Sequence, residues 1–260
     1  MKKYELTEET KVIGGKTLFR IRALRSFGDI KAGDLGGFIE NERNLSHEEN
    51  AWVGGNAQVV GNAWVGGNAK VGGCAWVGDE AWVIENAVIE GNAKVDGDAL
   101  VCGNAQVSGD ARVNGDARVR GYAQVSGDAR VSGDARVGGN ARVSGDARVE
   151  GDAQVVDNAR VVGNAQVGGD AWVGGYARVG GDGLINSNND YLCEQGLGSR
   201  NRSASFFKCK DGHIHVLCGC FSGNLDEFEN KVKKEHGNSK YAKEYLGFIE
   251  VVKTHFEVRQ

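Results

Sequence analysis

The chain has 260 residues, no proline, 41 glycines and a formal net charge of −4 at pH 7. A net acidic chain is a poor general nucleic-acid binder, because the phosphate backbone is bound by lysine and arginine. No apolar run is long enough to cross a bilayer, and the opening MKKYELTEE has no signal-peptide core. The six cysteines are then expected to be free thiols, and the sequence predicts a cytoplasmic protein that binds no membrane.

Residues 1–34 are expected to form an N-terminal β cap. Val12 to Thr17 read VIGGKT, and a Gly-Gly pair between two strand-like stretches favours the tight turn of a β-hairpin. In the second stretch Phe19, Ile21 and Ala23 alternate with arginines, as on a strand with one buried face.

A six-residue unit, Ala–x–Val–x–Gly–Asn/Asp, recurs from Ala51 to Ile185 with no insertion that shifts its frame. In Ala–x–Val the side chains point alternately inward, outward and inward, as on a short strand. The next three residues tolerate positive φ or bond their own backbone, so the chain turns a corner there. A short fixed period of this kind predicts an all-β solenoid, a parallel β-helix that spans residues 35–185.

The Asn/Asp position separates into classes when it is read at every third unit. One class contains no aspartate: Asn50, Asn68, Asn86, Asn104, Tyr122, Asn140, Asn158 and Tyr176. A second class is acidic after its first member: Asn62, Glu80, Asp98, Asp116, Asp134, Asp152 and Asp170. This segregation predicts three sides to each coil. The interior then holds only Val, Ile and Ala, so any ligand must bind on a face, at an end or between subunits.

The repeat frame extends back over one degraded coil between residues 35 and 50. Leu35 and His47 fall on valine positions, and Ile39 and Leu45 fall on alanine positions. We expect His47, the histidine nearest the solenoid, to be a packed residue and not a catalyst.

Two stretches carry a resemblance to a known family. The V-G-G-N-A-x pattern resembles the hexapeptide repeat of left-handed β-helix proteins, a family rich in acyltransferases. Upstream, FGDIKAGDLGGFIENERNLS (Phe27 to Ser46) is similar to the start of the YdcK-like hexapeptide proteins, described as transferases and common in phages and prophages. The resemblance implies a left-handed winding, a homotrimer, and acyl transfer with a histidine base near a groove between subunits. No histidine lies between residues 48 and 212. The repeat therefore offers no candidate base, and the chain is expected not to be an enzyme.

The outward positions of the repeat carry large apolar side chains near its start. Trp64, Trp82 and Leu100 lie one coil apart on one face, and Trp76 lies on another. An exposed row of aromatic residues predicts a contact surface, so we expect a homo-oligomer with these four residues in its interface. The alternative is that the tryptophans stack on one another within one chain.

After Ile185 the repeat stops, and residues 186–260 are expected to form a small α+β domain of a hairpin and two helices. Asp211-Gly212 between alternating runs is a strong hairpin signal. Asn224 begins the first helix with a capping box and Gly237 ends it, while Ser239 caps the second.

Cys209, His213, His215, Cys218 and Cys220 suggest zinc ligands by residue type. A two-residue turn at Asp211-Gly212 would place Cys209 and the two histidines on opposite faces of the hairpin. No metal site and no cofactor are therefore expected.

The densest polar cluster outside the repeat is a loop that contains Gly198, Ser199, Arg200, Asn201 and Arg202. Glycine lets backbone N–H groups point at an anion, Ser and Asn donate hydrogen bonds, and Arg supplies a two-pronged donor. An aromatic pair follows, Phe206 and Phe207, one of which would stack on a base while the arginines hold phosphate. The alternative is an ordinary flexible connector.

We therefore interpret the chain as a non-catalytic oligomeric binding protein whose C-terminal domain binds a small anionic, nucleotide-like ligand. Sequestration of a host signalling molecule would fit the phage occurrence that the resemblance implies. Two alternatives remain open. One is a hexapeptide-type acyltransferase, and the other is a structural or protein-binding scaffold that uses the tryptophan-bearing face.

Overall fold

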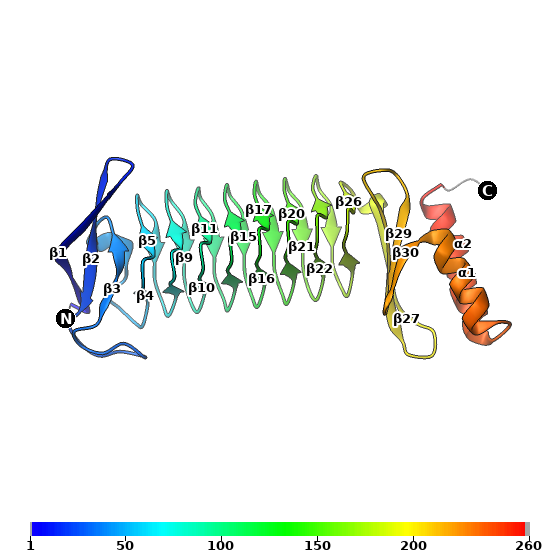
Figure 1. Ribbon diagram of the computed structural model, residues 1–260, viewed down its shortest axis with the longest axis horizontal. Coiled ribbons are helices and arrows are strands. Elements are labelled where there is room, and N and C mark those ends of the chain that lie inside the picture. Colours follow the sequence, from blue (N-terminus) through cyan, green and yellow to red (C-terminus); the bar gives the residue numbers. More distant parts are fainter. Residues whose placement is uncertain (1, 258–260) are drawn as a thin grey trace.

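The protein is elongated, and its parts follow one another along one long axis (Figure 1). A computed structural model describes residues 2–257. The N-terminal strands lie at one end and a stack of parallel coils forms the middle. A four-stranded sheet and two helices lie at the other end.

Each six-residue unit forms a two-residue strand, and the strands stack into three parallel sheets. The first contains β5 (Gln58–Val59), β8 (Trp76–Val77), β11 (Lys94–Val95), β14 (Arg112–Val113), β17 (Arg130–Val131), β20 (Arg148–Val149), β23 (Gln166–Val167) and β26 (Leu184–Ile185). The second contains β4 (Trp52–Val53), β7 (Lys70–Val71), β10 (Val88–Ile89), β13 (Gln106–Val107), β16 (Gln124–Val125), β19 (Arg142–Val143), β22 (Arg160–Val161) and β25 (Arg178–Val179). The third contains β6 (Trp64–Val65), β9 (Trp82–Val83), β12 (Leu100–Val101), β15 (Arg118–Val119), β18 (Arg136–Val137), β21 (Gln154–Val155) and β24 (Trp172–Val173).

The register confirms the predicted three-sided coil. Val125, for example, pairs with Val107 on one side and with Val143 on the other, each 18 positions away. The inward Ala and Val side chains are almost completely buried from Ala51 to Val179, as the alternation predicts. Burial of each aliphatic side chain contributes roughly 1.5–3 kcal/mol before chain entropy is counted.

The corners depend on residues with a left-handed backbone. Gly127 has a φ of 71°, and a Cβ added there would lie 2.9 Å from the backbone nitrogen of Gly145 in the next coil. Between Ala51 and Ile185, three corners instead hold acidic residues at positive φ: Asp79, Glu85 and Asp157. Each carboxylate accepts the backbone N–H of the glycine one coil further on, at 3.2, 2.7 and 2.9 Å respectively. This hydrogen bond offsets part of the strain that a side chain incurs at positive φ.

The asparagine class of corners forms a ladder of side-chain hydrogen bonds. Asn50 donates to Asn68, Asn68 to Asn86, and Asn86 to Asn104, at 2.9, 3.1 and 3.2 Å between Nδ2 and Oδ1. Asparagine both donates and accepts through one amide, so identical residues can link from coil to coil. Aspartate cannot donate when it is ionised, which explains why this corner excludes it.

At the N-terminal end, β1 (Tyr4–Ile13) and β2 (Lys16–Ala23) form the predicted hairpin, with Gly14 and Gly15 at φ 57° and 78° in its turn. β2 pairs with β3 (Leu35–Ile39), and β3 pairs in parallel with β5, so the hairpin extends the first solenoid sheet. A short 3-10 helix, η1 (Glu42–Asn44), follows.

The predicted frame of the degraded coil is wrong. Ile39 pairs with Val59 and Leu45 with Val65, so both occupy valine positions and not alanine positions. Each pair is separated by 20 residues instead of 18, which means that two extra residues lie between Leu45 and Val53. The sequence keeps six-residue spacing before and after this insertion, so a search for the period alone does not locate it.

His47 is packed, as expected. Its ring stacks on Tyr4 at a centroid distance of 4.3 Å, and its Nδ1 accepts the backbone N–H of Lys3 at 3.2 Å. Burial lowers the pKa of His47, which favours its neutral form.

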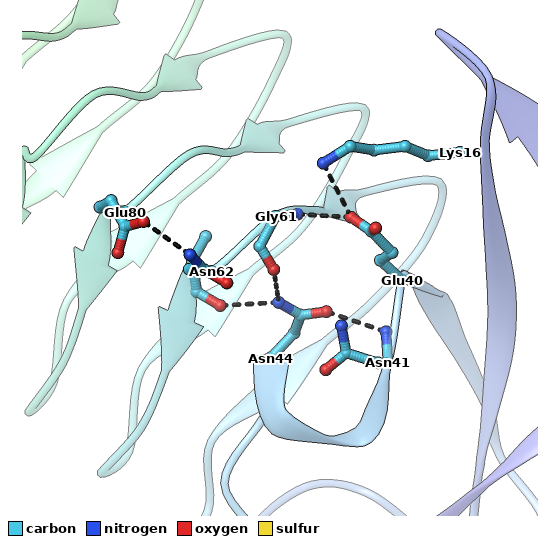
Figure 2. Close-up of polar contacts among 8 residues, drawn as sticks. Lys16, Glu40, Asn41, Asn44, Gly61, Asn62 and Glu80 are labelled. Atoms are coloured by element: carbon cyan, nitrogen blue, oxygen red, sulfur yellow. Dashed lines mark hydrogen bonds and ion pairs between the residues drawn. The ribbon is translucent and has the colours of Figure 1, made fainter.

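Polar side chains join the cap to the first coils (Figure 2). Glu40 accepts hydrogen bonds from the backbone N–H of Gly61 at 2.6 Å and from Lys16 Nζ at 3.1 Å. Asn44 donates to the carbonyls of Gly61 and Ala63 at 3.0 and 2.8 Å, and its own Oδ1 accepts the backbone N–H of Asn41. These contacts satisfy backbone groups that the irregular coil leaves without strand partners.

At the C-terminal end, η2 (Asn188–Asp190) leads into an antiparallel sheet of β27 (Tyr191–Leu197), β28 (Arg202–Lys208), β29 (Ile214–Cys218) and β30 (Phe221–Asn224). α1 (Leu225–His236) and α2 (Lys240–His255) follow, with the predicted caps at Asn224, Gly237 and Ser239. The predicted hairpin corresponds to β28 and β29, whereas the two outer strands of the sheet, β27 and β30, were not predicted.

The two faces of this sheet enter two different cores. Phe207 packs against the last solenoid coil, whereas Phe206 packs under the helices with Phe228 and Phe248. Gly183 stands where the repeat otherwise has alanine, because a Cβ there would lie 2.9 Å from the Phe207 ring. The sheet thus covers the open end of the solenoid with one face and the two helices with the other.

Candidate functional site

A pocket of about 370 Å³ lies in the C-terminal domain, between the β27–β28 turn, the β29–β30 turn and helix α1. Its lining is Ser199, Arg200, Arg202, Cys218, Cys220, Phe221, Phe228, Lys231, Val232, Glu235, His236 and Tyr245. The volume falls within the range of small-molecule sites, about 300–1,000 Å³. Three of the predicted ligand-binding residues, Ser199, Arg200 and Arg202, are among those that line it.

The loop that carries these residues is held in place by helix α2. Gly198 has a φ of 69°, and a Cβ there would lie 2.3 Å from the Tyr245 hydroxyl, so only glycine fits. Its backbone N–H donates to Glu244 Oε2 at 3.0 Å. That donor was predicted to face an anion and is instead used within the chain. Asn201, at φ 46°, completes the turn.

The rim of the pocket is cationic. Arg200, Arg202 and Lys231 contribute three positive charges, against one carboxylate from Glu235. Lys231 pairs with Glu235 at 2.9 Å, one helical turn away. Among residues 2–257, no ion pair involves Arg200 or Arg202. Both guanidinium groups therefore retain donors for an anion.

Aromatic rings form the floor. Phe228 meets Tyr245 edge to face at a centroid distance of 5.7 Å and lies tilted against Phe221 at 5.1 Å, while His236 stacks on Tyr245 at 5.6 Å. Burial raises the pKa of Tyr245 to about 12, and the neighbouring Cys218 thiol adds to the shift. The hydroxyl is therefore neutral at physiological pH and can donate as well as accept.

The prediction that Phe206 or Phe207 stacks on a base was wrong. Phe206 and Phe207 are fully buried in the two cores, so neither ring can stack on a base. The aromatic residues that line the pocket are instead Phe221, Phe228 and Tyr245, and Lys231 adds a charge. The sequence contained a usable signal for one of these, because Phe228 and Lys231 are three residues apart and so share a face of the predicted helix.

The comparisons with known proteins concern the solenoid. The family described as YdcK beta solenoid repeat matches residues 105–121, 123–139, 135–151 and 141–156. These stretches are regular coils of the three-sheet stack. The chain is a parallel β-solenoid built from six-residue units, and the family model matches part of that repeat. A solved Bacillus cereus structure described as a "putative acetyltransferase" has 12% sequence identity and a TM-score of 0.27. That match covers 70% of this chain and 92% of the other. No curated protein matches the sequence.

The outward tryptophans of this hexapeptide-repeat protein lie on two sheets. Trp64 and Trp82 pair on the third sheet, edge to face at 5.5 Å, and Leu100 follows Trp82. Trp82 nevertheless remains 50% exposed. Trp76 lies on the first sheet, where it packs against a small core of the cap that contains Phe38.

Cys209, His213 and His215 were expected to lie on opposite faces of the hairpin, and this prediction was wrong. Their donor atoms all lie within 4.8 Å of one another. Phe207 pairs with His215, one residue out of the predicted register. A shift of one residue moves every side chain to the other face of a strand.

The turn explains the shift. Cys209 N donates to the His213 carbonyl at 2.9 Å, so the loop between them has three residues, with Gly212 at φ 85° as its last. A three-residue loop that ends in a left-handed glycine is among the most common hairpin connections after the two-residue turn. Burial, followed by the nearby Asp211 and Asp182 carboxylates, raises the pKa of the Cys209 thiol to about 11.

In the described part of the chain, residues 2–257, no helix has both the length and the apolar character needed to span a bilayer.

Proposed function

We propose that this protein is a non-catalytic binding protein whose C-terminal pocket binds, and so sequesters, a small anionic, nucleotide-like ligand. The observation that carries the proposal is the pair of arginines, Arg200 and Arg202, which lack ion-pair partners among residues 2–257 and stand beside an aromatic floor.

The charges favour phosphate over carboxylate ligands of similar size. The side chain of Arg202 packs against the β29–β30 turn, because a Cβ added to Gly219 would clash with its Nη1 atom. Lys231 projects from the facing helix α1. Cations from two sides of one pocket match an anion with several oxygen atoms, and guanidinium groups bind phosphate with two parallel hydrogen bonds.

The floor favours a planar group on the same ligand. Phe221 is half-buried at the pocket wall, and its ring is braced by Phe228 behind it. A base has an apolar face that can pack on such a ring, as in proteins that bind single-stranded nucleic acid. A nucleotide combines both features, and the pocket volume admits one mononucleotide.

Isothermal titration calorimetry against a nucleotide panel tests the proposal, with inorganic phosphate and an uncharged nucleoside as part-ligands. Arg202→Ala and Arg200→Ala should each weaken binding about tenfold to a hundredfold, because a hydrogen bond to a charged group contributes about 1.5–3 kcal/mol. Phe221→Ala should weaken nucleotide binding and leave the weaker binding of phosphate unchanged.

Lys231→Ala and Lys234→Ala form a matched pair on helix α1. Lys231 lines the pocket and Lys234, three residues on, does not. Only Lys231→Ala should weaken binding. Equal effects of the two variants, or no heat from any nucleotide with wild-type protein, would contradict the proposal.

The same proposal includes a homo-oligomer, with a trimer expected from the hexapeptide resemblance. Trp82 supports this because half of its surface remains exposed even after it packs against Trp64. Native mass spectrometry at micromolar concentration tests it, and Trp82→Ala should dissociate the oligomer, whereas Trp76→Ala, under the cap, should not. A wild-type monomer would argue against the oligomer.

The rival function is a protein-binding scaffold that uses the face of Trp64, Trp82 and Leu100. It predicts a partner that is lost on Trp82→Ala and retained on Arg202→Ala. The nucleotide proposal predicts the reverse pattern for its ligand, so the two variants separate the two functions.

A further inference from the structure

A second site lies at the junction of the solenoid and the C-terminal sheet, apart from the anion pocket. We propose that Cys209, His213 and His215 bind a zinc ion there. The three residues come from the β28–β29 loop and the start of β29, and they open onto a hollow of about 530 Å³.

The positions of the donor atoms are close to those that zinc requires. The sulfur of Cys209 and one nitrogen from each histidine all lie within 4.8 Å of one another. In a tetrahedral site with Zn–S of about 2.3 Å and Zn–N of about 2.0–2.1 Å, such atoms lie roughly 3.3–3.6 Å apart. A small rotation of the exposed His213 side chain supplies the difference, while Cys209 is buried.

Neighbouring groups orient both imidazole rings. His213 Nδ1 contacts Asp211 Oδ1, which leaves Nε2 for a metal ion. His215 Nε2 lies 2.9 Å from the Ser222 hydroxyl, which leaves Nδ1. A hydrogen bond from the second ring nitrogen to a carboxylate or another oxygen is the usual support of a metal-binding histidine.

The surroundings carry negative charge. Asp182 from the last solenoid coil, Asp211 from the loop and Glu227 from helix α1 all line the hollow. Lysine is absent from its lining, so the local field favours a divalent cation. One thiolate and two imidazoles select zinc over magnesium or calcium, which prefer oxygen ligands.

The position gives the ion a structural consequence. The backbone of Cys209 forms an antiparallel β-bridge with Gly183 of the last coil, and Lys210 N donates to the Asp182 carbonyl at 3.2 Å. The ion would therefore tie the β28–β29 loop where it contacts the solenoid. Three protein ligands leave the fourth position of a tetrahedral zinc ion to water or to an anion in the hollow.

Zinc binding by the full-length chain, prepared without a histidine tag and stripped with chelator, tests the proposal. Dialysis against buffered zinc followed by elemental analysis should give one zinc per chain. Cys209→Ser and His213→Gln should each weaken zinc binding at least about a hundredfold, and Asp211→Asn about tenfold, the effect typical of residues that support a metal ligand. Cobalt in place of zinc should show a thiolate-to-metal absorption band that Cys209→Ser removes.

Two variants serve as controls. Cys74→Ser changes an exposed solenoid thiol, and His236→Gln changes a histidine of the anion pocket. Both should bind zinc as the wild type does. His213 is exposed, so His213→Gln should fold normally and its result is decisive. Less than stoichiometric zinc in the wild type, or unchanged affinity in His213→Gln, would overturn the proposal.

Discussion

Asp157 occupies a corner where most coils have glycine, and its substitution separates two opposing effects. Its backbone has a φ of 59°, and its carboxylate accepts the backbone N–H of Gly175, one coil on, at 2.9 Å. Asp157→Gly relieves the backbone strain and loses the hydrogen bond. Asp157→Ala loses the hydrogen bond and keeps a side chain at positive φ.

The magnitudes follow from these two terms. A left-handed conformation costs a residue with a Cβ about 1–2 kcal/mol, and aspartate tolerates it better than alanine does. The exposed hydrogen bond to Gly175 contributes about 1 kcal/mol. We therefore expect Asp157→Ala to lower the free energy of unfolding by about 2 kcal/mol. For Asp157→Gly the gain and the loss nearly cancel, so the change should stay within about 0.5 kcal/mol.

Two measurements check this order. Urea unfolding gives the global effect, and hydrogen exchange gives the local one, which matters because each coil of a solenoid contacts only its neighbours. The Gly175 amide should exchange faster in both variants, since both remove its acceptor. Asp157→Asn, which keeps an oxygen acceptor, is the conservative control. Both variants lose the hydrogen bond, so if Asp157→Gly were less stable than Asp157→Ala, the corner would not strain a residue that has a Cβ and the reasoning would fail.

Three further predictions concern the core, the cap and catalysis. Val125→Ala should lower the free energy of unfolding by about 2 kcal/mol through the cavity it leaves, whereas the outward Gln124→Ala should change it little, as urea unfolding can show. Burial lowers the pKa of Lys3 from 10.5 to about 8, with Arg25 adding to the shift. Between these pH values only the unfolded chain holds that proton, so stability should rise with pH from about 8 to 10.5 and stay flat below. Lys3→Met should abolish this rise in urea midpoints measured at pH 7.5 and 9.5, and an unchanged rise would disprove the assignment. Incubation with acyl-CoA and a panel of acceptors should show no protein-dependent release of CoA, and turnover lost on His213→Gln would instead favour the acyltransferase alternative.

The solenoid could be predicted from the sequence because its period is local and repeated. Each Ala–x–Val unit specifies the same strand, and the segregation of asparagine from aspartate at the corners gave the three-sided coil. The shift near Leu45 could not be found this way. The two inserted residues lie between segments that each keep the six-residue spacing, so only the observed pairing of Leu45 with Val65 reveals them.

The C-terminal domain was harder because its side chains were assigned to faces from one turn. Asp211-Gly212 is compatible with both a two-residue and a three-residue loop. The length of the loop decides whether Cys209 lies on the same face of the hairpin as the histidines or on the opposite face. Phe206 and Phe207 look like an exposed pair in sequence. They are buried because the sheet has a core on each side, the solenoid end on one and the helices on the other. The arginine loop stands out in the sequence because its polarity is local, and three of its residues line the pocket.

Because its coils are uniform, the length of the solenoid increases by the same amount with each coil. Each turn adds 18 residues and about 4.8 Å of length, the spacing between neighbouring strands. Gain or loss of one whole coil would re-form the same register, the same glycine corners and the same core, because coils such as those of Val107, Val125 and Val143 are interchangeable. A single duplication in the gene would therefore change the separation of the two ends by one fixed step and leave the N-terminal hairpin and the C-terminal pocket intact.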